Sequence, residues 1–217
     1  MRIRSKFLTL RQLLLPEGMA IILLAIKAVQ NVLMRGIMFT SFLEMVEADF
    51  GYVIVDKIIE SSDLASEGIY TSVGYYEDEE FEQLLANLSA EVSIDAQVLL
   101  ITFGKHLFTT LLDGYAVFFT AFDNVLDFLS AMNSYLRVDG MKLYPDMTPP
   151  SFECTTYEDG SLELVYSSER KLSFVVKGFI EKMIVYYGTP YKLEMEEIGT
   201  DGRAAKFIVS KQDDGRS

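Results

Sequence analysis

The chain has 217 residues, of which half are hydrophobic and 12% aromatic, so it can bury one sizeable core and general disorder is excluded. A formal net charge of −13 and a pI near 4.5 disfavour nucleic acid or an anionic membrane as the main partner. The single cysteine, Cys154, excludes an internal disulfide and a cysteine-rich zinc site, and the single histidine, His106, leaves little room for a multi-histidine metal centre.

Residues 1–33 differ from the rest of the chain. They carry Arg2, Arg4, Lys6 and Arg11, followed by the apolar stretch MAIILLAI. This stretch is far shorter than the roughly 20 residues that span a bilayer, and no convincing small-residue cleavage site follows it. We expect an extension upstream of a working domain that begins at Met34. A helix on a membrane surface is the alternative, so membrane association is expected only if this segment is part of the protein.

Four segments between Met34 and about Val138 show apolar residues at helical spacing. They are FTSFLEMVEADF, EDEEFEQLLANL, DAQVLLITFGKHLFTTLL and FDNVLDFLSAMNSYLRV. The first is closed by Gly51, and the second opens with acidic residues, which suit the positive end of a helix dipole. We therefore predict that the first part of the domain is helical.

After YPDMTPP the pattern is that of strands. SFECTTYEDGSLELVY predicts a hairpin that turns at residues 158–160, with Leu162, Leu164 and Tyr166 on the inward face. KLSFVVKGFIEKMIVYYG predicts an amphipathic helix, and YKLEMEEIGTDGRAAKFIVS a second hairpin that turns at residues 201–202. The predicted fold class is α+β, with a helical part followed by a four-stranded antiparallel sheet of two hairpins and one long helix between them.

The sequence offers little for catalysis or metal binding. YYEDEEFEQ lacks the spaced acids and glycine of a calcium loop, so we expect a solvated first helical turn there. His106 lies roughly 100° from the centre of its helix's apolar stripe, which favours a boundary position over a ligand. Cys154 falls on a predicted strand, where a buried structural thiol is the default. No phosphate loop, nucleophile elbow or spaced carboxylate cluster is present, so we do not expect an enzyme.

The stretch YSSER does suggest a binding site. Tyr166, Ser168 and Arg170 occur at every second position, which in an extended chain places three donors on one face. One of the three is always charged. A phenol, a hydroxyl and a guanidinium in a row are suited to an anion, and charge-assisted hydrogen bonds are the strong kind.

From Met34 onward the sequence resembles the H-NOX family, the haem–nitric oxide/oxygen binding domains related to the β subunit of soluble guanylate cyclase. The matching segments, in family order, are MRGIMF, GIYTSVGYYEDEE, TFGKHLF, LYPDMTPPSFE and YSSERK. The family signature Y-x-S-x-R is intact, and Met34–Ser217 spans 184 residues, about the family's domain size. We expect an H-NOX-like domain at residues 34–210 and a disordered tail at 211–217.

The resemblance implies a role for several residues. Tyr166, Ser168 and Arg170 would bind the propionates of a haem b cofactor, and Pro150 would press on the porphyrin and distort it. The distal pocket would be lined by Phe42, Leu107 and Val175, which offer no polar group to bound O₂. In this family an apolar distal pocket goes with nitric oxide binding.

One residue departs from the family. The proximal histidine lies thirteen positions before the proline that matches Pro150, and here that position holds Arg137. Arginine has no lone pair for iron. Met141, four residues on, is the first substitute candidate, because methionine ligates haem elsewhere. Tyr135, Tyr144 and His106 are poorer candidates. A haem-free pocket and an isolated variant of an ordinary sensor remain as alternatives.

The resemblance also implies how such a domain acts. We expect a cytoplasmic nitric oxide sensor that regulates a histidine kinase or a cyclic-di-nucleotide enzyme in trans, since the chain carries no output domain. A haem-free regulatory or dimerisation module of the same fold is the alternative. Nucleic acid is not expected as a partner.

Overall fold

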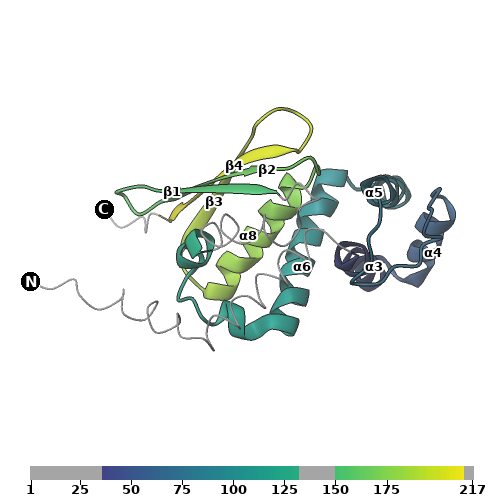
Figure 1. Ribbon diagram of the computed structural model, residues 1–217, viewed down its shortest axis with the longest axis horizontal. Helices are drawn as coiled ribbons and strands as arrows, with labels where there is room; N and C mark the ends of the chain where they lie inside the picture. Colours follow the sequence, from purple (N-terminus) through teal and green to yellow (C-terminus); the bar gives the residue numbers. More distant parts are fainter. Residues whose placement is uncertain (1–35, 132–149, 213–217) are drawn as a thin grey trace, which may run out of the picture.

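The computed structural model describes residues 36–131 and 150–212. A four-stranded sheet lies along one side of the molecule, with α8 (Ser173–Tyr187) beneath it and α6 (Ala96–Phe119) beside α8 (Figure 1). Three further helices, α3 (Ile37–Phe50), α4 (Tyr52–Glu60) and α5 (Asp78–Val92), form a separate group at the other side of α6. Residues 125–131 are also helical.

The helices α3–α5 form around a cluster of aromatic rings. Phe39 and Phe42, one helical turn apart on α3, are 1% and 0% exposed. The ring of Phe42 lies 5.0 Å from that of Phe81 on α5 and 5.4 Å from that of Phe103 on α6. Gly51 joins α3 to α4 at a φ of +87°, a value that side-chain-bearing residues rarely adopt.

Helices α6 and α8 cross at two glycines. A Cβ atom on Gly104 would lie 2.1 Å from the carbonyl oxygen of Val175, and one on Gly178 would lie 1.9 Å from that of Ile101. The two backbones are therefore in direct contact, which no larger residue allows at either position. The crossing brings α6 against the helix that the sheet covers.

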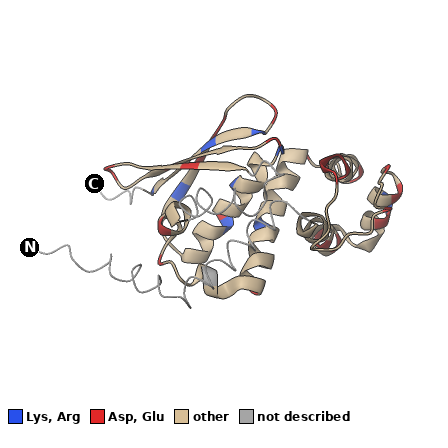
Figure 2. Cartoon of the chain, viewed as in Figure 1, with Lys and Arg blue, Asp and Glu red and all other residues tan. Residues whose placement is uncertain are grey.

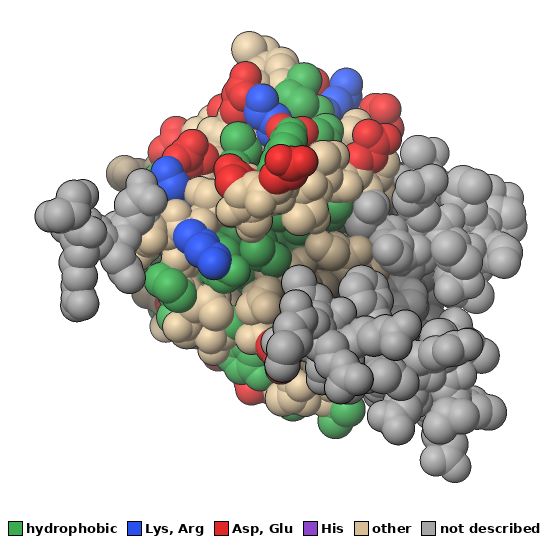
Figure 3. All heavy atoms as spheres, turned by 90° about the vertical axis from the view of Figure 1, so that its left-hand side faces the viewer, with side chains coloured by type: hydrophobic (Ala, Val, Ile, Leu, Met, Phe, Trp, Pro, Cys, Tyr) green, Lys and Arg blue, Asp and Glu red, His purple; other side chains and the backbone are tan. Residues whose placement is uncertain are grey.

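The sheet is antiparallel throughout, with the strand order β1-β2-β4-β3. Its strands are β1 (Ser151–Thr156), β2 (Leu162–Ser167), β3 (Tyr191–Glu197) and β4 (Ala204–Lys211). The face toward α8 buries Leu164, Tyr166 and Phe207 at 1% exposure or less. The other face carries charged side chains of both signs, including the pairs Lys192–Glu194 and Lys206–Glu196, and the upper part of Figure 3 shows red and blue side chains mixed with apolar ones. This is the usual arrangement of an antiparallel sheet that is covered on one side.

The α+β prediction is confirmed, including the two hairpins, the helix between them and the inward face of Leu162, Leu164 and Tyr166. Helix α4 was not predicted, because its nine residues are too short for a clear period and only Val55 and Ile58 are buried. The predicted extension at 1–33 lies outside the described residues, as does 213–217 of the predicted tail, so both stay predictions.

Candidate functional site

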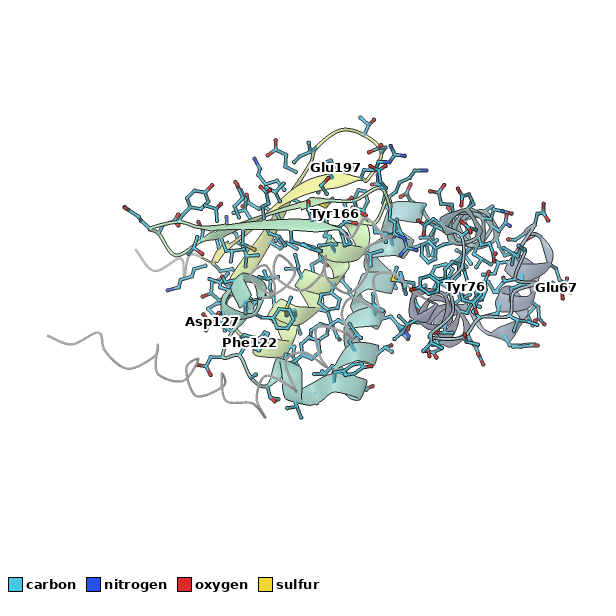
Figure 4. The ribbon with its side chains drawn as sticks, in the orientation of Figure 1. Glu67, Tyr76, Phe122, Asp127, Tyr166 and Glu197 are labelled. Carbon is cyan, nitrogen blue, oxygen red and sulfur yellow. The ribbon has the colours of Figure 1, made fainter. Side chains whose placement is uncertain are left out.

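The three donors of YSSER are brought together where β2 ends. Tyr166 is the last inward-facing residue of β2 and is 1% exposed. Its hydroxyl donates to the carbonyl oxygen of Arg170 at 3.4 Å, and the Ser168 hydroxyl accepts from the Arg170 N–H at 3.1 Å. Figure 4 shows Tyr166 where the sheet meets the upper ends of α8 and α6.

The way in which they meet differs from the prediction. We expected the donors to share one face of an extended chain, but β2 ends at Ser167 and residues 168–170 turn. The physical reason is the bond from the Arg170 N–H to the Ser168 hydroxyl, which replaces strand pairing with a local turn. The turn is fixed from the other side by the Ser168 N–H, which donates to the Arg203 carbonyl oxygen at 2.9 Å.

Two ion pairs join this turn to α5. The guanidinium of Arg170 pairs with Asp78, the first residue of α5. One helical turn later, Glu82 accepts from Lys171, with 2.9 Å between Oε1 and Nζ. The Arg170 side chain is only 20% exposed, so its interaction with a carboxylate is screened less than a surface pair would be.

Burial controls the chemistry of the phenol. It raises the pKa of Tyr166 from 10.0 to about 12, while the Ser168 hydroxyl and the Arg170 charge partly oppose that shift. The hydroxyl therefore keeps its proton over the physiological range. It remains a hydrogen-bond donor, which is the form that an anionic ligand requires.

The sheet register brings Pro150 to the same place. Ser151 and Ser167 are Cα partners in the β1–β2 ladder, and the next pair is Phe152 and Tyr166. Pro150 immediately precedes the first of these pairs and Ser168 immediately follows it. The strand ends therefore place two predicted site residues, 18 positions apart in the sequence, at the same end of one ladder.

An apolar cavity of about 340 Å³ opens beside the turn. Its lining combines apolar groups with two basic residues, Arg170 and Lys171, and four acidic ones, Asp78, Glu82, Glu197 and Asp201. The apolar lining comes from α3, α5, α6 and the start of α8, and consists mainly of Met38, Phe39, Phe81, Leu85, Leu100, Leu172 and Phe174. A guanidinium at the edge of an apolar space suits a flat, apolar ligand that carries a carboxylate.

The predicted distal residues are all buried but do not line this cavity. Phe42, Leu107 and Val175 are at most 2% exposed and belong to the hydrophobic core. Phe42 contacts Phe81, which does line the cavity. Their prediction as distal pocket residues is not tested by this arrangement.

Comparison with known proteins decides the family. The Haem-NO-binding family profile matches residues 35–195. The crystal structure of an Fe(II) unliganded H-NOX protein from K. algicida is 35% identical, covers 85% of this chain and 100% of that chain, and superposes with a TM-score of 0.75. The chain belongs to the H-NOX family.

Two further H-NOX structures are similar to this chain. A mutant of the K. algicida protein is 36% identical, with 84% of this chain and 98% of that chain covered and a TM-score of 0.76. The H-NOX from Shewanella woodyi, bound to IWP-051 in the Fe(II)CO ligation state, is 31% identical, with 84% and 96% covered and a TM-score of 0.68. H-NOX domains are haem-based gas sensors, and the expected sensor family is thereby confirmed.

The proximal position of this H-NOX domain lies outside the described residues. Arg137 and the substitute ligand candidates Met141, Tyr135 and Tyr144 all fall within 132–149. Their roles therefore stay predictions.

The two remaining candidates lie within the described part. His106 is half-buried on α6, and its Nε2 atom has no hydrogen-bond partner among the described residues. Cys154 is half-buried on β1, with its Sγ 3.5 Å from the Leu129 carbonyl oxygen, and burial raises its thiol pKa to about 11. Among residues 36–131 and 150–212, no group of three or more His, Cys, Asp or Glu is placed to hold a metal ion.

Sequence reasoning missed Asp78 and the cavity residues on α3. The sequence predicts a solvated helical turn around Asp78, and nothing local indicates that its partner is 92 positions away. Met38 offered a signal that was not used, because it lies one helical turn before Phe42 and so faces the same side.

No single helix in the described ranges is long and apolar enough to cross a membrane. Helix α5 and residues 96–117 of α6 together meet the same length and composition limits, but they are bent by 112°.

Proposed function

We propose that this H-NOX domain is a haem-based nitric oxide sensor that regulates a signalling partner in trans. One observation carries the proposal. The buried phenol of Tyr166, the Ser168 hydroxyl and Arg170 are brought together at the end of β2, and Arg170 also lines an apolar cavity, in a chain of this family. This combination suits a ligand with an apolar ring and a carboxylate edge, which describes haem b.

The residues that would hold haem come from both halves of the domain. Arg170 would bind a propionate by charge-assisted hydrogen bonds, with Ser168 and Tyr166 as neutral donors. The buried apolar side chains of Phe42, Leu107 and Val175 would exclude water from the ring. Pro150, at the end of the β1–β2 ladder, would contact the porphyrin from the proximal side. When bound, haem supplies the iron at which a diatomic gas is captured.

The proposed distal residues favour nitric oxide. Phe42, Leu107 and Val175 carry no hydrogen-bond donor, and stabilising bound O₂ depends on such a donor in the distal pocket. Nitric oxide needs no such donor, so an apolar distal pocket would not weaken its binding. We therefore propose an apolar distal wall at these three positions.

Ligation at the proximal side is proposed to be non-standard. Arg137 cannot donate an electron pair to iron, and an unpaired guanidinium facing a porphyrin would cost several kcal/mol, so its side chain must reach water or a carboxylate such as Asp139. Met141 is our first candidate for the substitute ligand. Met141 would then hold the iron, and Pro150 would contact the porphyrin, so these two residues are the proposed links between the ligand and the rest of the domain.

The second candidate function is a haem-free regulatory or dimerisation module, and Arg137 is the observation that favours it. In either case we propose a cytoplasmic protein with a partner such as a histidine kinase or a cyclic-di-nucleotide enzyme. A two-state element that a ligand biases is what such regulation requires.

The absorption spectrum of the purified full chain, with haem supplied, tests the proposal. We expect a sharp Soret band that shifts when nitric oxide is added, and loss of haem uptake in Arg170→Ala. The matched control is Arg203→Ala, because Arg203 is half-exposed and forms ion pairs with neighbouring surface acids. Met141→Ala should then change the spectrum.

Other outcomes separate the two candidates. If only Arg137→His binds haem, the pocket is sound and the natural protein is the haem-free module. If neither protein binds haem, the haem-based proposal is wrong.

A further inference from the structure

The loop between α4 and α5 is held in one conformation by several contacts. The Tyr70 ring stacks on Phe39 with 4.5 Å between centroids, and its hydroxyl donates to Glu80 at 2.7 Å. The Thr71 N–H donates to the Tyr76 hydroxyl at 2.8 Å. Figure 4 places Tyr76 between α3 and α5. The loop is therefore anchored by its tyrosines and is not a loose connection.

The same loop presents large apolar side chains outward. Ile69 and Val73 are each 71% exposed and Tyr75 is 60% exposed, and all three fall within seven residues. We call these three side chains the loop surface. Single exposed apolar residues are ordinary, but three on one anchored loop are typical of a contact surface.

The surroundings of the loop surface are strongly acidic. Residues 36–95 contain fourteen acidic residues and one basic residue, Lys57. Glu67 and Glu77 are exposed on the loop, and Glu79 is exposed at the start of α5. Figure 2 shows acidic positions, in red, along α3, α4 and α5. A segment that covers the loop surface should therefore combine apolar side chains with positive charge.

Residues 1–35 of this chain have that chemistry and join the fold at this loop. They contain six basic residues and one acidic residue, together with the apolar stretch MAIILLAI at 19–26. The Gly36 N–H donates to the Gly74 carbonyl oxygen at 2.8 Å, so the chain enters the described fold beside the loop surface. The ten residues from Ile26 to Gly36 can extend over roughly 30 Å, ample to reach any part of the loop.

We propose that residues 1–35 bind back on the loop surface, with MAIILLAI covering Ile69, Val73 and Tyr75 and the basic residues facing the acidic helices. Two independent features favour this occupant over another chain: the charge complementarity and the point of entry at Gly36. The proposal does not depend on haem, since none of the three side chains of the loop surface lines the cavity.

Hydroxyl-radical footprinting of the full chain tests this. We compare the wild type with a charge-reversed variant that combines Arg2→Glu, Arg4→Glu, Lys6→Glu and Arg11→Glu. The substitutions lie outside the described fold, so they leave its core intact. The modification rates of Ile69, Val73 and Tyr75 should be low in the wild type and rise several-fold in the variant. High salt should produce the same rise, because it screens exposed charges.

The internal controls are Val98 and Val185, which are 52% and 71% exposed and lie on α6 and α8. Their rates should be equal in both proteins. Equal rates at the loop surface in wild type and variant would overturn the proposal. So would protection of the loop surface that appears only with phosphatidylglycerol vesicles, or only as the protein concentration rises, since the occupant would then be a membrane or a second copy.

Discussion

The helical region at 36–95 and the sheet region at 150–212 differ in the balance between their acidic and basic residues. The helical region has fourteen acidic residues against one basic residue, whereas the sheet region has ten against eight. On the sheet, Lys192 pairs with Glu194 at 2.7 Å, and Lys206 pairs with Glu196 across β3 and β4. In the sheet region most charges can be balanced within the region, whereas the acidic side chains of the helical region repel one another unless basic groups from elsewhere pair with them, as Arg170 and Lys171 do with Asp78 and Glu82.

Packing differs between the two regions as well. Helix α3 packs on α5 through side chains, the rings of Phe39, Phe42 and Phe81. Helix α8 meets α6 backbone to backbone at Gly104 and Gly178, a closeness that the helical region has where Gly36 meets the Thr71 carbonyl oxygen. Side chains can adjust to a substitution by changing rotamer, but backbones in contact cannot, so the crossing of α6 and α8 should be less tolerant than the packing of α3 on α5.

The largest expected effect is therefore at the helix crossing. Gly178→Ala places a Cβ 1.9 Å from the Ile101 carbonyl oxygen, which forces α6 and α8 apart. We expect a loss of about 3 kcal/mol in the free energy of unfolding, measured by urea denaturation. Gly114→Ala on α6 is the control, because no atom of the described residues lies within 4 Å of its Cβ, and it should cost nothing. Equal effects of the two substitutions would show that the crossing is adaptable.

A smaller loss is expected in the helical region when Glu80 is removed. Glu80 is 5% exposed and accepts hydrogen bonds from the hydroxyls of Ser66 and Tyr70, so it holds the α4–α5 loop. Glu80→Ala leaves both donors without their charged acceptor and should cost about 1.5–3 kcal/mol in urea denaturation. Glu79→Ala, at an exposed position beside it, should change stability by no more than about 0.5 kcal/mol. Similar values for both would mean that the loop does not depend on Glu80.

The smallest effect concerns alkaline pH. Burial raises the pKa of Tyr166 in the folded protein from 10.0 to about 12, so the protonated phenol favours folding. This contribution is complete below pH 10 and is lost as the pH rises from about 10 to about 12, because the unfolded state then releases its proton first. The urea midpoint of Tyr166→Phe should therefore fall less steeply with rising pH than the midpoint of the wild type. The same pH dependence of the urea midpoint in both proteins would contradict a raised pKa of Tyr166 in the folded state.

Much of the fold follows from periodicity. The alternation of Leu162, Leu164 and Tyr166 predicted the inward face of β2. The helical spacing of apolar residues before the first strand predicted α3, α5 and α6, and the same spacing between the two hairpins predicted α8. Helix α4 was missed because nine residues with two buried side chains leave too little pattern. Local pattern therefore identifies long elements and fails for short ones that depend on tertiary contacts.

The candidate site was predictable only in part. Its three donors could be found because they lie within five residues, in a motif whose chemistry suits an anion. Asp78 could not, since its pairing with Arg170 depends on how α5 lies against the end of β2. The contacts at Gly104 and Gly178 could not either, because a glycine inside a helix has many possible reasons and the sequence does not distinguish among them.

The β1–β2 hairpin makes the assembly of the site depend on a turn that takes no part in it. Residues 157–161 close the hairpin, with the Tyr157 N–H bonded to the Ser161 carbonyl oxygen at 2.9 Å. A slip of the ladder by one position would turn Tyr166 from the core to the solvent and would separate Pro150 from Ser168. The turn therefore affects the site through the register that it helps to set, although none of its residues belongs to the site.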